Sequence, residues 1–165
     1  MTFNHFDAQG QAVMVDVSNK QQTRRIAVAK ATVLMRPETL ELIRSGQTSK
    51  GDVLGVARLA GISAAKKTAD LIPLAHPLAL HAVSIEFEMK TASASIDVQA
   101  KVTAVERTGV EMEAMVAASL AALTIYDMCK GVDRGISVTD VLLLHKDGGK
   151  SGLYQRDCAA EPEAL

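Results

Sequence analysis

The sequence predicts one α+β domain in which helices pack against an antiparallel sheet, and three observations support this class. The chain has 165 residues, which suits a single domain with one hydrophobic core. Stretches of alternating apolar and polar residues, typical of half-buried strands, are interleaved with stretches that repeat apolar residues at helical spacing. Aromatic residues make up only 3% of the chain against 48% hydrophobic residues, so aliphatic side chains and methionine must form the core.

The first half of the chain predicts two extended segments followed by two helices. Residues 11–17 and 25–35 are rich in Val, Ile and Ala with partial alternation, a pattern typical of strands. A short helix is expected over 37–44, because its leading proline suits the first helical turn. A second helix is expected from about 52 to 70, where apolar residues recur at helical spacing.

The second half predicts a hairpin, a long helix and a last strand. Residues 81–90 and 93–106 alternate apolar with polar side chains and form a natural antiparallel pair. The helix follows over 109–130, and 136–145 is a further strand. The order from residue 25 is strand, helices, strand, strand, helix, strand, which is the split βαβ arrangement of a ferredoxin-like domain.

Composition and termini restrict the classes of partner. Residues 1–152 are predicted to form the domain and 153–165 a mobile tail. A net charge of −1 argues against a nucleic-acid surface, so an anionic partner should be small. The polar N-terminus and the absence of a long apolar stretch argue against a signal peptide or a membrane span, and predict a cytoplasmic protein. Cys129 and Cys158 have neither disulfide nor zinc-site character.

The long predicted helix carries charges at both ends of an uncharged middle. Glu113 and Asp127 project within roughly 40° of one another around the helix but lie about 21 Å apart along its axis. One small ligand could hardly touch both within a single subunit. If both belong to a site, a second subunit should supply one of them.

Two of the polar features near this helix have more than one interpretation. Asp127 and Lys130 are three residues apart, so they form either a plain helix-end ion pair or part of a reactive site. His76 lies between Ala75 and Pro77, where the prolines of the loop restrict how the ring is presented. It is either an ordinary loop histidine or a general acid or base.

Scattered cations could hold a polyphosphate if the fold gathers them. Glycine lets backbone N–H groups approach phosphate closely, and two lysines flank the pair Gly148-Gly149. The alternative is an ordinary turn with solvated lysines, because the spacing is not that of a Walker A loop. The candidate cations are Arg25, Lys50, Lys66, Lys146 and Lys150.

Three segments together resemble one family: KGDVLGVARLAGISAAKKTADLIPLAHPL, TGVEMEAMVAASLAALTIYDMCK and the GGKSG that ends at Gly152. In order and spacing they resemble the signature blocks of the MoaC family of cyclic pyranopterin monophosphate synthases, which acts in molybdenum cofactor biosynthesis. The resemblance extends from about residue 14 to residue 152. The chain departs from the family pattern at Ala75, where a cysteine is expected, so this chain has no thiol to use at that position.

The resemblance implies a fold, an assembly and a reaction. It implies a ferredoxin-like subunit, a homohexamer built as a trimer of dimers, and active sites at subunit interfaces. The implied activity is that of a phosphorus–oxygen lyase, which converts (8S)-3′,8-cyclo-7,8-dihydroguanosine 5′-triphosphate to cyclic pyranopterin monophosphate and diphosphate. No resident cofactor or metal site is expected, although Mg²⁺ could accompany the triphosphate.

The resemblance also implies residue roles. Lys50 and Lys130 match the catalytic lysines and Asp127 the catalytic aspartate, and His76 is expected to assist proton transfer or bind phosphate. We hypothesise that the lysines act as general acid and base, with at least one pKa lowered by burial and neighbouring cations. The expected substrate-binding residues are Leu74, Ala75, His76, Met112 and Glu113, with Arg25, Lys66, Lys146 and Lys150 toward the triphosphate.

Two other classes of function compete with catalysis. A non-catalytic nucleotide-binding regulatory oligomer would need the cations but not the acid and base set, since a ferredoxin-like fold does not fix activity. A scaffold that binds proteins through the apolar helix would need no small-molecule ligand and no lysine with a shifted pKa.

Overall fold

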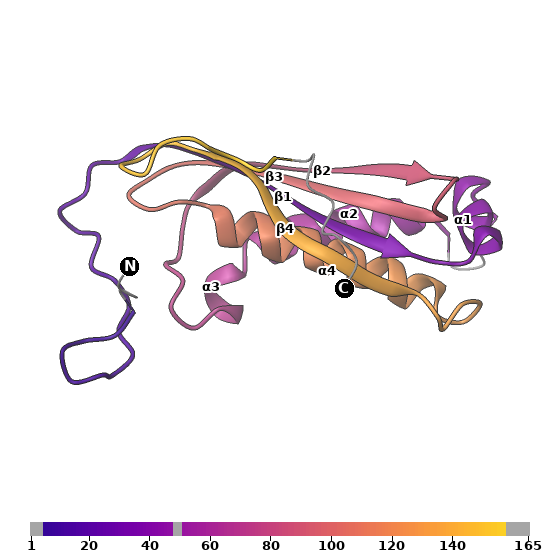
Figure 1. Ribbon diagram of the computed structural model, residues 1–165, viewed down its shortest axis with the longest axis horizontal. Coiled ribbons are helices and arrows are strands. Elements are labelled where there is room, and N and C mark those ends of the chain that lie inside the picture. Colours follow the sequence, from indigo (N-terminus) through magenta and orange to yellow (C-terminus); the bar gives the residue numbers. More distant parts are fainter. Residues whose placement is uncertain (1–4, 48–50, 158–165) are drawn as a thin grey trace.

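The computed structural model describes residues 5–47 and 51–157, and this part of the chain folds as an α+β domain (Figure 1). Its five-stranded antiparallel sheet has the order β2-β3-β1-β4-β5. The first four strands have the order of a ferredoxin-like sheet, so the predicted fold class is confirmed. The elements are β1 (Thr23–Leu34), α1 (Pro37–Arg44), α2 (Val53–Ala65), α3 (Thr68–Leu71), β2 (Leu80–Lys90), β3 (Ser95–Glu106), α4 (Glu111–Cys129), β4 (Ser137–Asp147) and β5 (Tyr154–Gln155).

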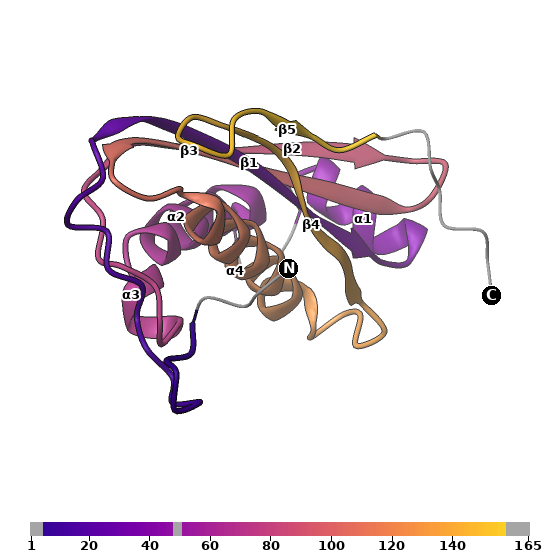
Figure 2. The same cartoon turned by 60° about the vertical axis from the view of Figure 1, so that its left-hand side comes forward.

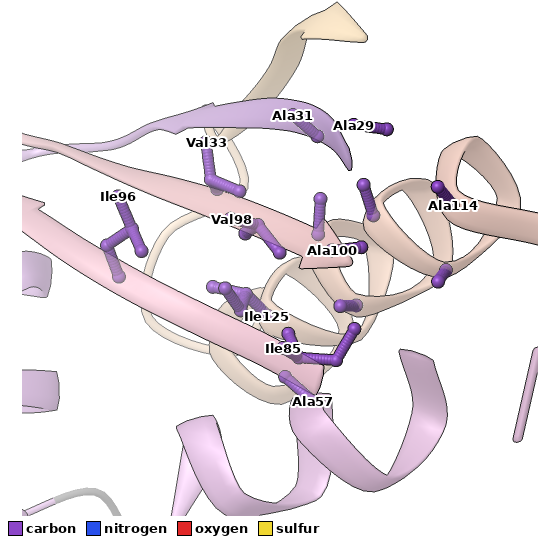
Figure 3. Close-up of a cluster of buried hydrophobic side chains, with 14 of the residues drawn as sticks. Ala29, Ala31, Val33, Ala57, Ile85, Ile96, Val98, Ala100, Ala114 and Ile125 are labelled. Carbon is purple, nitrogen blue, oxygen red and sulfur yellow. The ribbon is translucent and has the colours of Figure 1, made fainter. Parts of the chain in front are cut away.

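Helices α2 and α4 cover one face of the sheet (Figure 2). Alternate residues of β1 and β3 point into this layer, and many of them are alanines that let α4 approach closely. Figure 3 shows Ala29, Ala31 and Ala100 on the strands near Ala114 on α4. The predicted aliphatic core is therefore present, and it fixes the axis of α4 against the sheet.

Glycine sets the contact between the two helices. A Cβ at Gly61 in α2 would lie 3.0 Å from the carbonyl oxygen of Ala117 and 3.2 Å from the Cβ of Ala121, both in α4. This spacing is too tight for a side chain without movement of α4. The position of α4, and of the charged residues at its ends, thus depends on close packing along its middle.

Two predicted elements differ from the structure. Residues 11–17 form no strand: only Ala12 makes an isolated bridge, with Phe6, because no sheet edge lies beside the segment. The helix expected over 52–70 divides into α2 and α3 at Lys66 and Lys67. There the hydroxyl of Thr68 donates to the Ala65 carbonyl oxygen at 3.0 Å, a local bond that competes with regular helical bonding.

The segment after residue 152 begins with a short strand. Tyr154 pairs with Lys146 and Gln155 with His145, and the backbone N–H of Arg156 donates to the Leu144 carbonyl at 2.8 Å. The start of the predicted tail is therefore attached to the edge of the sheet. Residues 158–165 lie outside the described residues, and the mobility of the tail stays a prediction.

Helix α4 is long and apolar enough to cross a membrane by length and composition alone, contrary to the expectation from sequence. In the structure it lies across β1, β3 and β4 and packs along α2. Ala117, Ala118, Ala121 and Ile125 are fully buried in it. Its apolar character is thus accounted for by the core of the domain.

Candidate active site

The structure divides the predicted site residues between the two ends of α4. His76 and Glu113 lie where α4 begins, beside the N-terminal segment and α3, whereas Asp127 and Lys130 lie where it ends, near α1 (Figure 1). Glu113 and Asp127 belong to the same helix, Glu111–Cys129, and Lys130 directly follows its last residue. The separation of about 21 Å inferred from helical rise therefore holds in the folded chain.

A cavity of about 390 Å³ opens at the start of α4. The proline-bracketed loop after α3 and the N-terminal segment line it together with the first turn of α4. It brings together every predicted residue of the substrate-contact loop and of that first turn. Its predicted lining residues are Leu74, Ala75, His76, Met112 and Glu113.

The N-terminal segment fixes the ring of His76. Nε2 of His76 lies 2.8 Å from the carbonyl oxygen of Val15. A carbonyl only accepts hydrogen bonds, so Nε2 carries a proton and donates it. This arrangement leaves Nδ1 as the nitrogen that can exchange a proton or meet a ligand.

Glu113 is only 4% exposed although it carries a carboxyl group. Burial raises its pKa from the usual 4.5 to about 7, and the negative charge of Glu111 acts in the same direction. The backbone hydrogen bond that Glu113 accepts in the first turn of α4 lowers its pKa and partly offsets this increase. A carboxyl group with a pKa near neutrality, in a cavity beside a histidine, is suited to proton transfer.

A second cavity, of about 560 Å³, adjoins the first and is lined mainly by cations. Both cavities share Lys20, Thr108, Gly109 and Glu111. Glu111 lies 3.3 Å from Nζ of Lys146, which also donates to Ser151. The cationic lining residues are Lys20, Arg25, Arg107, Lys146 and Lys150.

The glycine pair after β4 packs directly on Arg25. A Cβ at Gly149 would fall 1.6 Å from Nη1 of Arg25, and one at Gly148 would fall 2.1 Å from the carbonyl oxygen of Arg24. Both glycines also have positive φ, of 103° and 76°. Arg25 in turn donates from Nε to the Glu106 carbonyl at 3.2 Å. The glycines thus let the loop close on an arginine whose position is already set.

A third cavity, of about 360 Å³, continues from the first on the side of α3. It shares His76, Leu78 and Glu113 with the first cavity and adds Lys66. The three cavities are adjacent because they share lining residues, and we refer to them together as the trough; His76 and Glu113 line two of them. Five cationic side chains line the second cavity, and Lys66 lines the third.

The opposite end of α4 is exposed. Nζ of Lys130 lies 2.6 Å from Oδ1 of Asp127, and their side chains are 51% and 61% exposed. The hydrogen bond and the charge of Asp127 raise the pKa of Lys130 above its usual value. We hypothesised that at least one catalytic lysine has a lowered pKa, whereas the pKa of Lys130 shifts upward. Lys50 lies outside the described residues.

Similarity to known proteins agrees with this arrangement. The sequence matches the MoaC family over residues 14–149. The chain belongs to the MoaC family. It is 64% identical to the cyclic pyranopterin monophosphate synthase of Geobacter metallireducens over 157 residues, which is 95% of this chain and 98% of the relative.

Other MoaC relatives are equally similar. The chain is 64% identical over 160 residues to the synthase of the same name from Trichlorobacter lovleyi, covering 97% of this chain and 100% of the relative. It is 62% identical over 157 residues to the one from Geobacter sulfurreducens, covering 95% and 98%. Most residues that line the first two cavities lie within the matched residues 14–149. The exceptions are His5 in the first cavity and Lys150 and Ser151 in the second.

Three further MoaC residues contribute to the site without having been predicted. Lys20 and Arg107 line the cationic cavity, and the backbone of Val15 orients His76. Lys20 lies in a polar turn and Arg107 directly precedes the signature TGVEMEA, but neither is distinguished by its own spacing. Among residues 5–47 and 51–157, no group of three or more His, Cys, Asp or Glu is placed to hold a metal ion.

Proposed function

We propose that this enzyme is a cyclic pyranopterin monophosphate synthase. It converts (8S)-3′,8-cyclo-7,8-dihydroguanosine 5′-triphosphate to cyclic pyranopterin monophosphate, and diphosphate leaves. It is a phosphorus–oxygen lyase that acts in molybdenum cofactor biosynthesis in the cytoplasm. No resident cofactor is proposed, although Mg²⁺ could arrive with the triphosphate.

The observation that carries this proposal is the trough, in which a cationic cavity adjoins the cavity of His76 and Glu113. Its cationic cavity suits a triphosphate, because five side chains supply positive charge that attracts phosphate oxygens. The adjoining cavity of about 390 Å³ is less charged and holds His76 and Glu113. A nucleotide-derived substrate would therefore lie with its phosphates beside Arg25 and its ring system beside His76.

The reaction needs proton transfer and charge stabilisation at two places. The purine-derived ring exchanges protons on nitrogen and carbon as it rearranges. Cyclisation of the phosphate requires a sugar-derived hydroxyl to lose its proton and attack the α-phosphorus, while the bond to diphosphate breaks. Arg25, Lys146 and Lys150 would stabilise the negative charge that develops on the departing diphosphate. Lys66, a further candidate for the triphosphate, lines the third cavity beyond His76 and Glu113, so it would not contact a diphosphate that lies beside Arg25 of the same subunit.

Glu113 and His76 are suited to the proton transfers at the ring. Both line the first cavity, and the pKa of Glu113 is about 7. Near neutral pH the carboxyl group can therefore give or accept a proton at little cost. Nδ1 of His76 is a second group in the cavity that can take part in proton transfer.

Lys130 is the general acid in this proposal. Asp127 raises the pKa of Lys130, so the ammonium form is maintained at neutral pH and can donate a proton or stabilise an anion. The general base would then be Lys50, whose pKa is the one that burial and cations must lower. Asp127 orients Lys130 through the 2.6 Å contact.

The two ends of α4 imply that each active site takes residues from two subunits. Asp127 lies about 21 Å along the axis from Glu113 and Lys130 lies farther still, which is too far for one small substrate. We propose that the exposed Asp127–Lys130 end of one subunit completes the trough of another. A homohexamer, built as a trimer of dimers, provides such pairs in closed symmetry.

A direct assay tests the reaction. Purified protein is incubated with the cyclised nucleotide, and diphosphate and the cyclic pyranopterin product are measured together. Wild type should release one diphosphate per product, and Lys50→Ala and Lys130→Ala should each abolish most turnover, while Lys101→Ala, an exposed lysine on β3, should retain it. Binding of the nucleotide without any diphosphate would instead indicate a regulatory oligomer. Near-wild-type turnover of both lysine variants would contradict the mechanism.

A further inference from the structure

A buried carboxylate lies directly after the exposed end of α4. Asp133 is only 3% exposed and stands three residues after Lys130, in the turn that leads to β4. It lines none of the three cavities described above. Burial of an ionised side chain is costly unless hydrogen bonds compensate it, so its partners define what it does.

Asp133 joins the turn after α4 to the start of α1. Oδ2 accepts from the backbone N–H of Arg36 at 2.9 Å and from the hydroxyl of Thr39 at 3.0 Å. Oδ1 accepts from the backbone N–H of Gly135 at 3.0 Å and lies 3.4 Å from Nε of Arg36. The guanidinium of Arg36 also donates to the carbonyl of Val132. One carboxylate therefore connects two segments that are nearly a hundred residues apart.

One of these contacts satisfies a backbone N–H at the start of α1. Arg36 occupies the position before the first turn of α1 and makes no side-chain cap of its own. The Asp133 carboxylate supplies the acceptor there, at the positive end of the α1 helix. The backbone bond from Arg36 is the main cause that lowers the pKa of Asp133, so the carboxylate stays ionised at neutral pH.

One of the two segments held by Asp133 directly follows the proposed catalytic lysine Lys130. Lys130 ends α4 three residues before Asp133, and its exposed side chain depends on the backbone of the turn for its direction. The backbone N–H of Asp133 itself donates to the Cys129 carbonyl at 3.0 Å, which links the turn to the last residue of α4.

We infer that Asp133 is a positioning residue for catalysis: it fixes the α4–β4 turn against α1 and thereby sets the direction of the Asp127–Lys130 pair. This role rests on the proposed function, since it is exerted through Lys130. Asp133 touches no substrate. Its loss should therefore slow the chemical step while the phosphate-binding end of the trough, at the far end of α4, keeps its affinity.

The test compares Asp133→Asn with Asp97→Asn. Asp97 is a matched buried carboxylate, 8% exposed, that accepts from Thr32 at 2.7 Å and from Lys90 at 2.6 Å. It lies on the sheet face away from the helices, because its neighbours Ile96 and Val98 point into the core. Both variants lose a buried ionic network, but only one of the two networks adjoins Lys130.

For Asp133→Asn we expect kcat to fall about 10- to 100-fold, because small misplacements of a catalytic group cost rates of this order. KM should change less than about threefold. The kcat of Asp133→Asn should also lose part of the pH dependence that Lys130 gives the wild-type enzyme. Asp97→Asn should keep kcat within about twofold at a similar loss of thermal stability. Should Asp133→Asn fail to fold, Thr39→Val removes one donor alone and should lower kcat about threefold.

Several outcomes would overturn the inference. The positioning role of Asp133 would be contradicted by an unchanged kcat in Asp133→Asn, or in Thr39→Val if Asp133→Asn does not fold. An equal loss of kcat in Asp97→Asn would show a general effect of destabilisation. The wild-type control separates this inference from the proposed function: no diphosphate from wild type contradicts the function itself, whereas normal wild-type turnover with an active Asp133→Asn variant contradicts only the inference.

Discussion

The two ends of α4 differ in how completely a single chain builds them. At the first end, Glu113 is buried, His76 is fixed by a backbone carbonyl, and cations line one cavity of the trough. At the second end, Asp127 and Lys130 project into solvent. Enclosure is what shifts a pKa and strengthens electrostatic contacts, so only the first end is formed for binding in one subunit. Under the proposed function, we expect another subunit to enclose the second end.

The physical reason lies in the core between the ends. The middle of α4 contains several alanines that pack in the core, and it carries no charged side chain. Its two hydroxyl groups, of Ser119 and Thr124, donate to carbonyl oxygens of the helix itself. The helix therefore acts as a rigid spacer of fixed length. A reaction that uses both ends must therefore take residues from more than one copy of the chain. We expect substitutions at the two ends to change different kinetic constants.

The largest effect is expected from Lys130→Ala. Loss of the proposed general acid should lower kcat about 10²- to 10⁴-fold and leave KM within a few-fold, because the trough at the other end is intact. Steady-state diphosphate release gives both constants, with Lys101→Ala as the control. A large rise in KM at unchanged kcat would show that Lys130 binds substrate uniformly and takes no special part in the transition state.

An intermediate effect is expected from Gly149→Ala. The new Cβ would collide with the guanidinium of Arg25 and displace it. Because the substrate then loses one contact to a charged group, KM should rise about tenfold. Gly152→Ala is a matched control in the same loop, since Gly152 also has positive φ but nothing within 4 Å of a built Cβ. Equal effects in the two variants would point to backbone strain and not to Arg25.

The smallest effect is expected in the stability of Glu113→Gln. The folded-state pKa of Glu113 is raised to about 7, so wild type loses stability as pH rises from about 4.5 to 7, by about 3 kcal/mol at most. Below pH 4.5 the carboxyl is protonated in both states and this loss is absent. Urea unfolding from pH 4 to 8 should therefore show a shallower decline in Glu113→Gln. Parallel pH profiles for the two proteins would contradict the raised pKa.

Much of the fold could be predicted because local patterns decided it. The helix expected over 37–44 is α1 as observed, and the alternation over 81–106 gave both strands of the hairpin within two residues of their observed bounds. Residues 11–17 alternate in the same way but form no strand, because a strand also needs a neighbouring edge with which to pair. That segment instead uses the carbonyl of Val15 to hold His76.

The site was predictable in part for the same reason. Residues of the signature segments could be assigned, and helical rise alone separated Glu113 from Asp127. Lys20, Arg107 and Asp133 could not be found, because each acts through neighbours far away in the chain. Asp133 contacts Arg36 at a separation of 97 residues, and nothing in its local sequence indicates that contact.

The shared active site is the central claim, and complementation between two inactive variants tests it most directly. His76→Ala and Lys130→Ala are each purified, then unfolded and refolded together in equal amounts, with each variant refolded alone as the control. If every site takes His76 from one subunit and Lys130 from another, random mixing restores two intact partners at about a quarter of the sites. Diphosphate release near a quarter of the wild-type rate is the predicted result, and a mixture no more active than the separate variants would contradict the account.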